Sequence, residues 1–425
     1  MEIFSFMKAN IAKILNSKYY KYFDYIAFAV LLVLTSVASL VLFYRQAIYA
    51  PGPPWPSDIK PYIEEMLGTN TKYNFPYPVM FKLGKLINYF APSPEWAMVI
   101  AVTLLNALAI IVVKIVLDKY TGAKLLSTIS TTCLFFVSMI YGSVFERFGI
   151  LNRMRGVCSP NPWHNHTFIA ARPFMIVAFI FGVITLAQYE KDFAKGATNS
   201  WKQLSLYFIF AISLLLTTMT KPSYTLVHMG TFGLIMIYRL FVAKWKNFRQ
   251  TILMGLFYIP TIIDLLYQYS SNFTGVASTG EEQGIGIGLF RVWSYSCHNI
   301  PLAIILGLFF PIVVLIFNWK SLKEDDIFKT SWLVLLMSFF MAAVFYEKGF
   351  REHHGNFFWG YQCGQFIVFM TSVIIILKDT LKLFNDGIRS KKTFVLLIEW
   401  CAFGIHTLMG LLYFYLLTAY GITYM

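Results

Sequence analysis

Long apolar runs follow one another along almost the whole chain and are separated by short polar segments. A helix needs roughly 20 predominantly apolar residues to cross the hydrocarbon core of a bilayer. The marginal pair among these runs is separated only by Thr220-Lys221-Pro222. Eleven runs predict membrane-spanning helices, at about 25–47, 95–117, 123–143, 171–189, 203–219, 223–242, 251–269, 299–318, 329–347, 356–378 and 393–419.

The first apolar run could belong to a signal peptide or to an uncleaved helix. A basic flank with four lysines precedes it, as in a signal peptide, but the run continues to Phe43, which is long for a signal sequence. We therefore expect an uncleaved helix. Residues 1–22 are then a basic amphipathic segment on the cytoplasmic membrane surface. Residues 23–425 form a single polytopic membrane domain.

The distribution of basic residues predicts the orientation of these spans. With a cytoplasmic N-terminus and alternating spans, the inside segments carry 22 of the 35 Lys and Arg residues, although the outside segments are longer. This asymmetry follows the positive-inside rule for a multi-pass protein of the cell (plasma) membrane, and it places Met425 outside. The long loops 48–94, 144–170, 270–298 and 348–355 are then external and form the active face.

Composition excludes the main soluble alternatives. Hydrophobic residues make up 57% of the 425 residues and charged residues 13%, against about 25% charged residues in a typical soluble domain. A soluble enzyme, a disordered chain and a disulfide scaffold are excluded. The net charge of +14 comes mostly from residues that flank apolar runs, so nucleic acid is not an expected partner. The sequence predicts an all-α integral membrane protein.

The first external loop contains the most informative carboxylate. A Pro-rich stretch ends in Ser57-Asp58, and a short amphipathic helix is expected from there to about Leu67. A second helix is expected from Pro78 to residue 90, with its apolar face flat on the membrane. Asp58 could be a helix cap or a catalytic group, and the sequence leaves both possibilities open.

The second external loop carries a dense cluster of polar and aromatic residues. Trp163, His164 and Asn165 are a combination that holds sugars, since an indole ring covers an apolar sugar face and amides bind hydroxyls. The alternative is an aromatic belt at the membrane interface. His164 and His166 have no carboxylate nearby in this loop, so a metal is not expected.

Cations near the predicted external helix ends could bind a phosphate. Arg172, Lys221 and Arg351 would supply the positive charge. The alternative for Lys221 and Arg351 is snorkelling to lipid headgroups. The last external loop adds His354, and five of the seven histidines fall in external loops. Core packing does not account for so one-sided a distribution.

These features resemble the GT-C superfamily of polytopic glycosyltransferases, whose donors are sugars linked to polyprenyl phosphate. The shared features are an acidic residue soon after the first span, and two membrane-lying helices in the first external loop. The motifs that carry the resemblance are Asn161-Pro-Trp-His-Asn165, Arg172-Pro-Phe, Lys221-Pro-Ser, and Glu347…Arg351…His354-Gly-Asn-Phe…Trp359-Gly. The match departs from the usual acidic motif, because the neighbours of Asp58 are Ser57 and Ile59 instead of a second carboxylate.

The resemblance implies a reaction and a set of roles. Asp58 would be the catalytic base, and the donor phosphate would bind Arg351, Lys221, His354 and Arg172. The sugar or acceptor would bind Trp163, His164, Asn165, Asn356 and Trp359. The expected partners are membrane lipid, the polyprenyl-phosphate sugar and a glycan or lipid acceptor of the cell envelope. No cofactor beyond this co-substrate is expected.

Two other functions fit parts of the pattern. A transporter or flippase of lipid-linked sugars would need ionisable residues along its spans, and only Asp264, Glu399 and His406 are candidates. A membrane O-acyltransferase would need an intramembrane histidine, such as His406, or else His353 or His354. Neither alternative requires a Pro-rich loop that leads into an acidic helix start.

Overall fold

The structure is almost entirely helical. The computed structural model describes residues 18–49, 55–71, 74–140, 142–196, 201–273, 284–386 and 390–422. Most of the predicted segment 1–22, most of the Pro-rich stretch, and Met425 lie outside the described residues. The longer helices are α2 (Lys18–Tyr49), α5 (Pro94–Thr121), α6 (Lys124–Leu134), α8 (His166–Ala194), α9 (Trp201–Thr218), α10 (Ser223–Val242), α11 (Phe248–Leu256), α12 (Ile259–Phe273), α14 (Ile300–Phe317), α16 (Asp326–Val344), α17 (Phe357–Asp386) and α18 (Ser390–Tyr420).

Short elements connect the long helices. Two strands pair antiparallel, with Ile285 opposite Glu347 and Ile287 opposite Phe345. They join the segment before α13 to the end of α16. The short elements are α3 (Ile59–Leu67), α4 (Val79–Asn88), η1 (Ser143–Phe148), α7 (Arg153–Gly156), β1 (Ile285–Ile287), α13 (Arg291–Ser294), α15 (Ser321–Glu324), β2 (Phe345–Glu347) and η2 (Gly349–His354).

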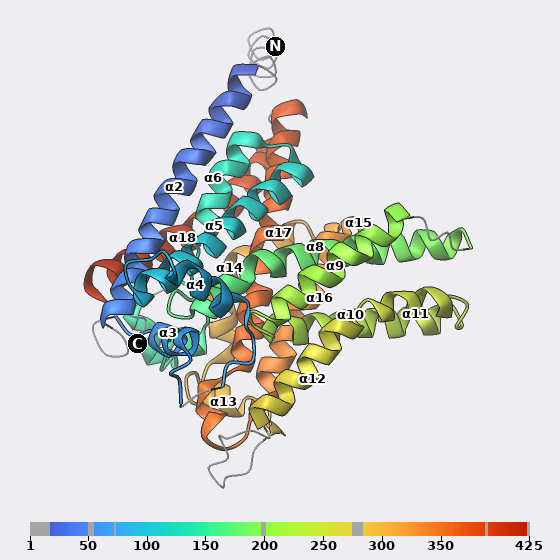
Figure 1. Cartoon of the computed structure of the whole chain (residues 1–425). Helices are drawn as coiled ribbons and strands as arrows, with labels where there is room; N and C mark the ends of the chain where they lie inside the picture. Colours follow the sequence, from blue (N-terminus) through green and yellow to red (C-terminus); the bar gives the residue numbers. More distant parts are fainter. Residues whose placement is uncertain are drawn as a thin grey trace.

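The structure does not confirm the expected count of eleven membrane-spanning helices. Within the described residues, seven helices are long and apolar enough to cross a membrane: α2, α5, α8, α10, α14, α16 and α18. The number rises to eight if the bent pair α11 and α12 is one span. The chain is thus an all-α membrane protein with seven or eight candidate spans. The predicted span 356–378 lies in α17, which runs through the centre of the molecule (Figure 1).

Three predicted spans differ from continuous long helices. The run 123–143 gives only the 11-residue helix α6, and 203–219 gives the 18-residue helix α9, whose apolar part is shorter than a span. The run 251–269 is broken at Phe257-Tyr258, where α11 and α12 meet at 53°. Hydropathy records that a segment is apolar, but it does not record whether the backbone is helical throughout or where a helix ends.

The chain after α6 is extended and buried instead of helical. Val137 and Met139 are fully buried there. Extended backbone at this depth needs hydrogen-bond partners from neighbouring helices. The Ser138 N–H donates to the His406 carbonyl (3.1 Å). Gly410 of α18 permits the close approach, since a Cβ there would lie 1.4 Å from the Phe136 carbonyl oxygen.

The two helices of the first loop form where they were expected, but their apolar faces do not lie flat on a membrane. Helix α3 buries Ile59, Tyr62, Ile63 and Met66, and α4 buries Met80, Phe81 and Gly84. These faces pack against each other and against α5. The short helices thus form part of the protein wall.

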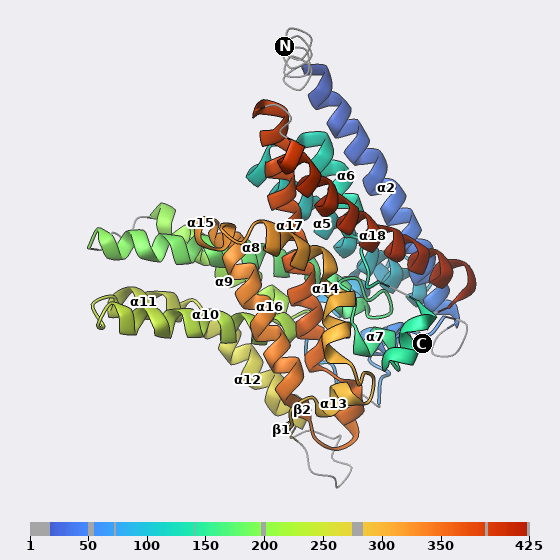
Figure 2. The same ribbon diagram turned by 180° about the vertical axis from the view of Figure 1, so that it is seen from behind.

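The helices diverge from one end of the molecule. In Figures 1 and 2, α2, α5 and α6 extend in one direction, and α8 to α11 extend to the side. The helix ends near α3 and α4, which we call the α3/α4 end, are joined by backbone hydrogen bonds. The Asp58 N–H donates to the His164 carbonyl (3.2 Å), and the Val79 N–H donates to the Met219 carbonyl (3.1 Å). The chain therefore returns repeatedly to this end.

Candidate functional site

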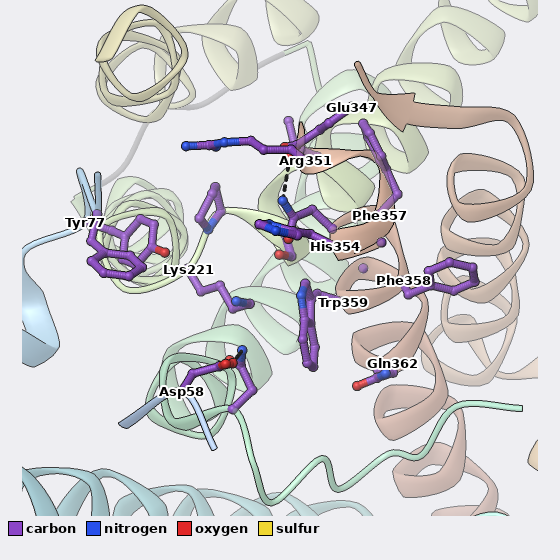
Figure 3. Close-up of a pocket in the computed structure, with 18 of the residues that line it drawn as sticks. Asp58, Tyr77, Lys221, Glu347, Arg351, His354, Phe357, Phe358, Trp359 and Gln362 are labelled. Carbon is purple, nitrogen blue, oxygen red and sulfur yellow. Dashed lines mark hydrogen bonds between the residues drawn. The ribbon is translucent and has the colours of Figure 1, made fainter. Parts of the chain in front are cut away.

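One cavity of about 470 Å³ opens at the α3/α4 end. Its wall combines residues from α3, α7, α10, α12, α16, β2, η2 and α17 with loop residues between them. Figure 3 shows Lys221, His354 and Trp359 around a common space, with Asp58 and Arg351 on opposite sides. Eight of the ten site residues expected from the sequence line it: Asp58, His164, Asn165, Lys221, Arg351, His354, Asn356 and Trp359.

Asp58 stands at the start of α3, but its carboxylate does not cap that helix. It occupies the N-cap position, yet within the described residues no backbone N–H of α3 donates to its side chain. The nearby Ile59 N–H instead faces the Ser57 hydroxyl, at 3.4 Å. Oδ2 of Asp58 accepts a hydrogen bond from the Asn165 amide at 2.9 Å. The capping interpretation of this residue therefore fails, and its carboxylate belongs to the cavity wall.

Asn165 connects Asp58 to the start of α8. Its Oδ1 accepts from the Phe168 N–H (2.9 Å) and caps the helix, while its Nδ2 donates to Asp58. The same Oδ1 accepts from the Thr167 hydroxyl at 2.9 Å. Because both amide atoms are engaged, the orientation of Asn165 is fixed. The carboxylate of Asp58 is thereby held by a helix start.

Lys221 lies in the turn between α9 and α10 and is buried. Its Nζ donates to the Thr167 hydroxyl (3.1 Å) and lies 4.9 Å from the centre of the Trp359 ring. Burial lowers its pKa from 10.5 to about 8, although Asp58 acts in the opposite direction. Taking an ammonium out of water disfavours its charge. A ligand anion in the cavity would restore part of the lost solvation.

Arg351 and His354 come from η2, on the other side of the cavity. A 3₁₀ helix has about three residues per turn, so residues three apart share a face. Both side chains line the cavity. The guanidinium of Arg351 approaches the Asn272 side-chain oxygen at 3.4 and 3.5 Å. Partial burial, aided by Arg351, lowers the pKa of His354.

A second carboxylate, Glu347, lines the cavity and was not assigned a role from the sequence. Its Oε2 accepts from the Asn356 amide at 2.6 Å. Burial raises the pKa of Glu347 above its usual value, while the Asn356 bond and Arg351 oppose the change. Tyr77 and Gln362 are further wall residues that sequence reasoning missed. The motif containing Glu347 was visible in the sequence, but the inward direction of its side chain was not.

His164 and Trp359 form an aromatic corner of the cavity. Their ring centres lie 5.4 Å apart with a 45° angle between the planes. Burial lowers the pKa of His164, so its imidazole is neutral near pH 7. A neutral imidazole beside an indole offers hydrogen bonding and an apolar face together. That combination suits a sugar ring.

Trp163 and Arg172 do not reach the cavity. The Trp163 ring is buried against Phe43, Phe136 and Phe414. The prediction that Trp163 contacts a sugar is therefore wrong. Its indole points into the core, whereas the next residue, His164, lines the cavity.

Arg172 lies further along α8 and is fully buried. Its Nη1 donates to the Asn161 side-chain oxygen (2.6 Å), and its guanidinium lies near the rings of Phe135, Phe168 and Phe366. The prediction that Arg172 binds the donor phosphate is therefore wrong, because its guanidinium does not line the cavity. Helix α8 begins at His166, so Arg172 is well inside the helix and faces the extended segment after α6. Here Arg172 ties that segment to α8.

His164 and His166 point in different directions. His166 is buried, and its Nε2 is paired with the Gln46 side-chain oxygen at 3.0 Å. His164 faces the cavity. The two imidazoles therefore do not converge. No group of three His, Cys, Asp or Glu side chains that could hold a metal ion occurs among the residues that the structure describes.

Part of the cavity wall is apolar and comes from long helices. Leu226 and Val227 of α10, Met341 of α16 and Phe357 of α17 line it. Leu226 is 39% exposed. Helix α10 also points its N-terminus at the cavity, and the start of a helix carries partial positive charge. The cavity thus has a charged part and an apolar part.

Comparison with known proteins assigns no family. No protein-family model matches the chain, and no curated protein matches it.

Proposed function

We propose that the chain is a membrane glycosyltransferase similar to the GT-C superfamily. It would transfer a sugar from a polyprenyl-phosphate donor to a glycan or lipid acceptor of the cell envelope. The supporting observation is the mixed character of the cavity wall. Asp58, Lys221 and Arg351 border the same space as the apolar side chains of α10 and α16. A lipid with a phosphosugar head has the same division into a charged part and an apolar part.

The donor phosphate would bind between Lys221 and Arg351, near His354. The ammonium is a point charge, whereas the guanidinium can bind two phosphate oxygens at once. The N-terminus of α10 adds partial positive charge at the same place. The prenyl chain would leave the cavity past Leu226, an apolar wall residue of α10 that is 39% exposed. The sugar would then lie beside Trp359, His164 and Asn165.

Asp58 would act as the general base of the transfer. It would take the proton of an acceptor hydroxyl, whose oxygen attacks the anomeric carbon of the donor sugar. The bond between that carbon and the phosphate oxygen breaks, and the electron pair leaves with the lipid phosphate. Lys221 and Arg351 would stabilise the phosphate as it departs. The reaction inverts the anomeric centre, as the resemblance implies.

The orientation in the membrane is part of the same proposal. The N-terminus would be cytoplasmic and the α3/α4 end external, in agreement with the positive-inside count. Lys60 and Lys195 are both exposed, so each accepts a labelled cysteine without repacking. Labelling of intact cells should reach position 60 and not position 195. The reverse pattern would place the cavity on the cytoplasmic side and overturn the external acceptor.

The test of the activity is Asp58→Asn in membranes supplied with a radiolabelled polyprenyl-phosphate sugar. The asparagine can still accept from Asn165 but cannot take a proton, so we expect transfer to fall about a hundredfold or more. A matched control is Glu65→Gln on the same short helix, whose Oε2 accepts from Asn70 (2.7 Å) and which does not line the cavity. If a folded Asp58→Asn protein still transfers sugar at a near-normal rate, Asp58 is not the general base.

The O-acyltransferase alternative loses its intramembrane histidine. His406 Nδ1 is paired with the Ser138 carbonyl (2.7 Å), and Nε2 accepts from the Phe310 N–H (3.3 Å). Both nitrogens thus hold the extended segment and α14 in place. A flippase would use the same phosphate-binding groups, so the appearance of label on an acceptor separates transfer from transport.

A further inference from the structure

The short helix η2 has an inner and an outer face. Arg351 and His354 are three residues apart and both line the cavity. Glu352 lies between them and points toward α13, on the opposite side from the cavity. Gly349 and Gly355 flank this turn with φ of 71° and 62°, a left-handed conformation that glycine adopts without strain. Two such glycines leave the segment few conformational restraints of its own.

A fork of hydrogen bonds holds Glu352 from outside. Nε of Arg291 donates to Oε1 at 2.7 Å, and Nη2 donates to Oε2 at 3.1 Å. The Tyr295 hydroxyl donates to Oε1 at 2.5 Å. Hydrogen bonds from Arg291 lower the pKa of Glu352, so the carboxylate is ionised at neutral pH. A bidentate charge-assisted pair fixes direction as well as distance.

The residues that hold Glu352 are themselves anchored. Arg291 also donates to the Tyr346 hydroxyl (3.2 Å), and its guanidinium lies 4.5 Å from the centre of that ring. Tyr346 belongs to β2, which pairs with β1 directly before α13. A separate hydrogen bond runs from Arg155 Nη1 to the His353 carbonyl at 3.1 Å. Helix η2 is therefore hydrogen-bonded directly to α7 and to the α13 segment, and Arg291 of α13 is in turn anchored to β2.

We propose that Arg291 and Tyr295 are positioning residues, which hold Glu352 so that Arg351 and His354 face the cavity and bind the phosphate of a lipid ligand. The proposal rests on the proposed function only for the identity of that ligand. Binding is stronger when the contacting groups are ordered beforehand, since less conformational entropy is lost on association. The fork supplies that order from outside the cavity.

The structural half of the proposal is tested by hydrogen exchange of the purified full-length protein. Glu352→Gln removes the charge, and Arg291→Lys keeps a charge but loses the fork. Both variants should exchange the amides of residues 349–354 roughly ten times faster, because a charge-assisted pair no longer restrains them. The control is Asp326→Asn, which breaks an exposed ion pair with Lys329 (2.6 Å) in another part of the molecule. Unchanged exchange in both fork variants would overturn the proposal.

The binding half uses undecaprenyl monophosphate without a sugar as the probe. We expect Glu352→Gln to weaken its binding about fivefold to tenfold, and Asp326→Asn to leave it unchanged. In an Arg351→Ala background, the same Glu352→Gln change should weaken binding clearly less, because the Arg351 side chain that Glu352 positions is absent. Equal effects in the two backgrounds would show that Glu352 acts elsewhere and would overturn the positioning role.

These measurements separate this proposal from the proposed function. If Asp58→Asn retains full transfer while Glu352→Gln still loosens η2 and weakens lipid-phosphate binding, the catalytic assignment fails and the positioning role stands. If η2 loosens but the affinity for the lipid phosphate is unchanged, the positioning role fails, whatever Asp58 does.

Discussion

The two ends of the molecule treat their charges differently. Away from the cavity, Lys114 contacts Asp24 at 3.1 Å and Asp118 at 2.7 Å, and Lys378 contacts Asp325 at 2.7 Å. At the α3/α4 end, Asp58 is held by an amide and Lys221 by a hydroxyl. A buried charge that is only solvated by neutral groups keeps most of its field. Charges that hold helices together are neutralised in pairs, whereas the cavity charges remain available for a ligand.

The largest difference should appear when the two aspartates are compared. Asp24→Asn removes one of the two carboxylates that contact the buried Lys114 and leaves Asp118 at 2.7 Å, so we expect a loss of about 1–3 kcal/mol. We expect a clear fall in the thermal unfolding temperature of the purified protein. Asp58→Asn should leave that temperature within a few degrees, since an asparagine also accepts from Asn165. If Asp58→Asn also lowers the unfolding temperature strongly, Asp58 has a structural role, and the contrast between the two aspartates is wrong.

The sequence predicted the residues of the cavity better than it predicted the number of membrane-spanning helices. The alternation of apolar runs and the positions of Asp58, Lys221 and Arg351 at run ends were enough to predict that they meet. This inference needs only the order of crossings. The inference does not depend on whether 123–143 is a continuous helix, because α6 and the chain after it still make one crossing.

Other features depended on side-chain direction, which apolar periodicity does not encode. Trp163 and His164 are neighbours, yet one ring enters the core and the other faces the cavity. Arg172 looked like a phosphate ligand because it is a cation near a run end, but its helix begins earlier than predicted. Glu347 stood in a quoted motif, and only its position at the end of β2 reveals that it lines the cavity.

The next prediction concerns the pH dependence of the cavity charge. The pKa of Lys221 is lowered from 10.5 to about 8, so the ammonium is present below pH 8 and is lost as the pH rises through that value. Binding of undecaprenyl monophosphate should weaken several-fold between pH 7 and about 9. Because the folded pKa lies below the unfolded one, stability should change in the opposite direction and increase from about pH 8 to 10.5.

A charge-preserving variant provides the control for this pH effect. Lys221→Arg keeps its charge across the whole range, so the decline in binding above pH 8 should disappear even if its affinity at pH 7 is lower. A decline that persists in Lys221→Arg would assign the titration to another group.

The smallest expected effect distinguishes charge from geometry at Arg351. If the guanidinium binds the lipid phosphate with two nitrogens, Arg351→Lys keeps the charge and loses the second bond, and affinity should fall roughly threefold to tenfold. Arg351→Gln removes the charge as well and should weaken binding further. If Arg351→Lys binds as well as the native protein, Arg351 contributes only a diffuse positive field. The cavity would then resemble the other end of the molecule more closely, because Arg351 would no longer count among the charges held for a ligand.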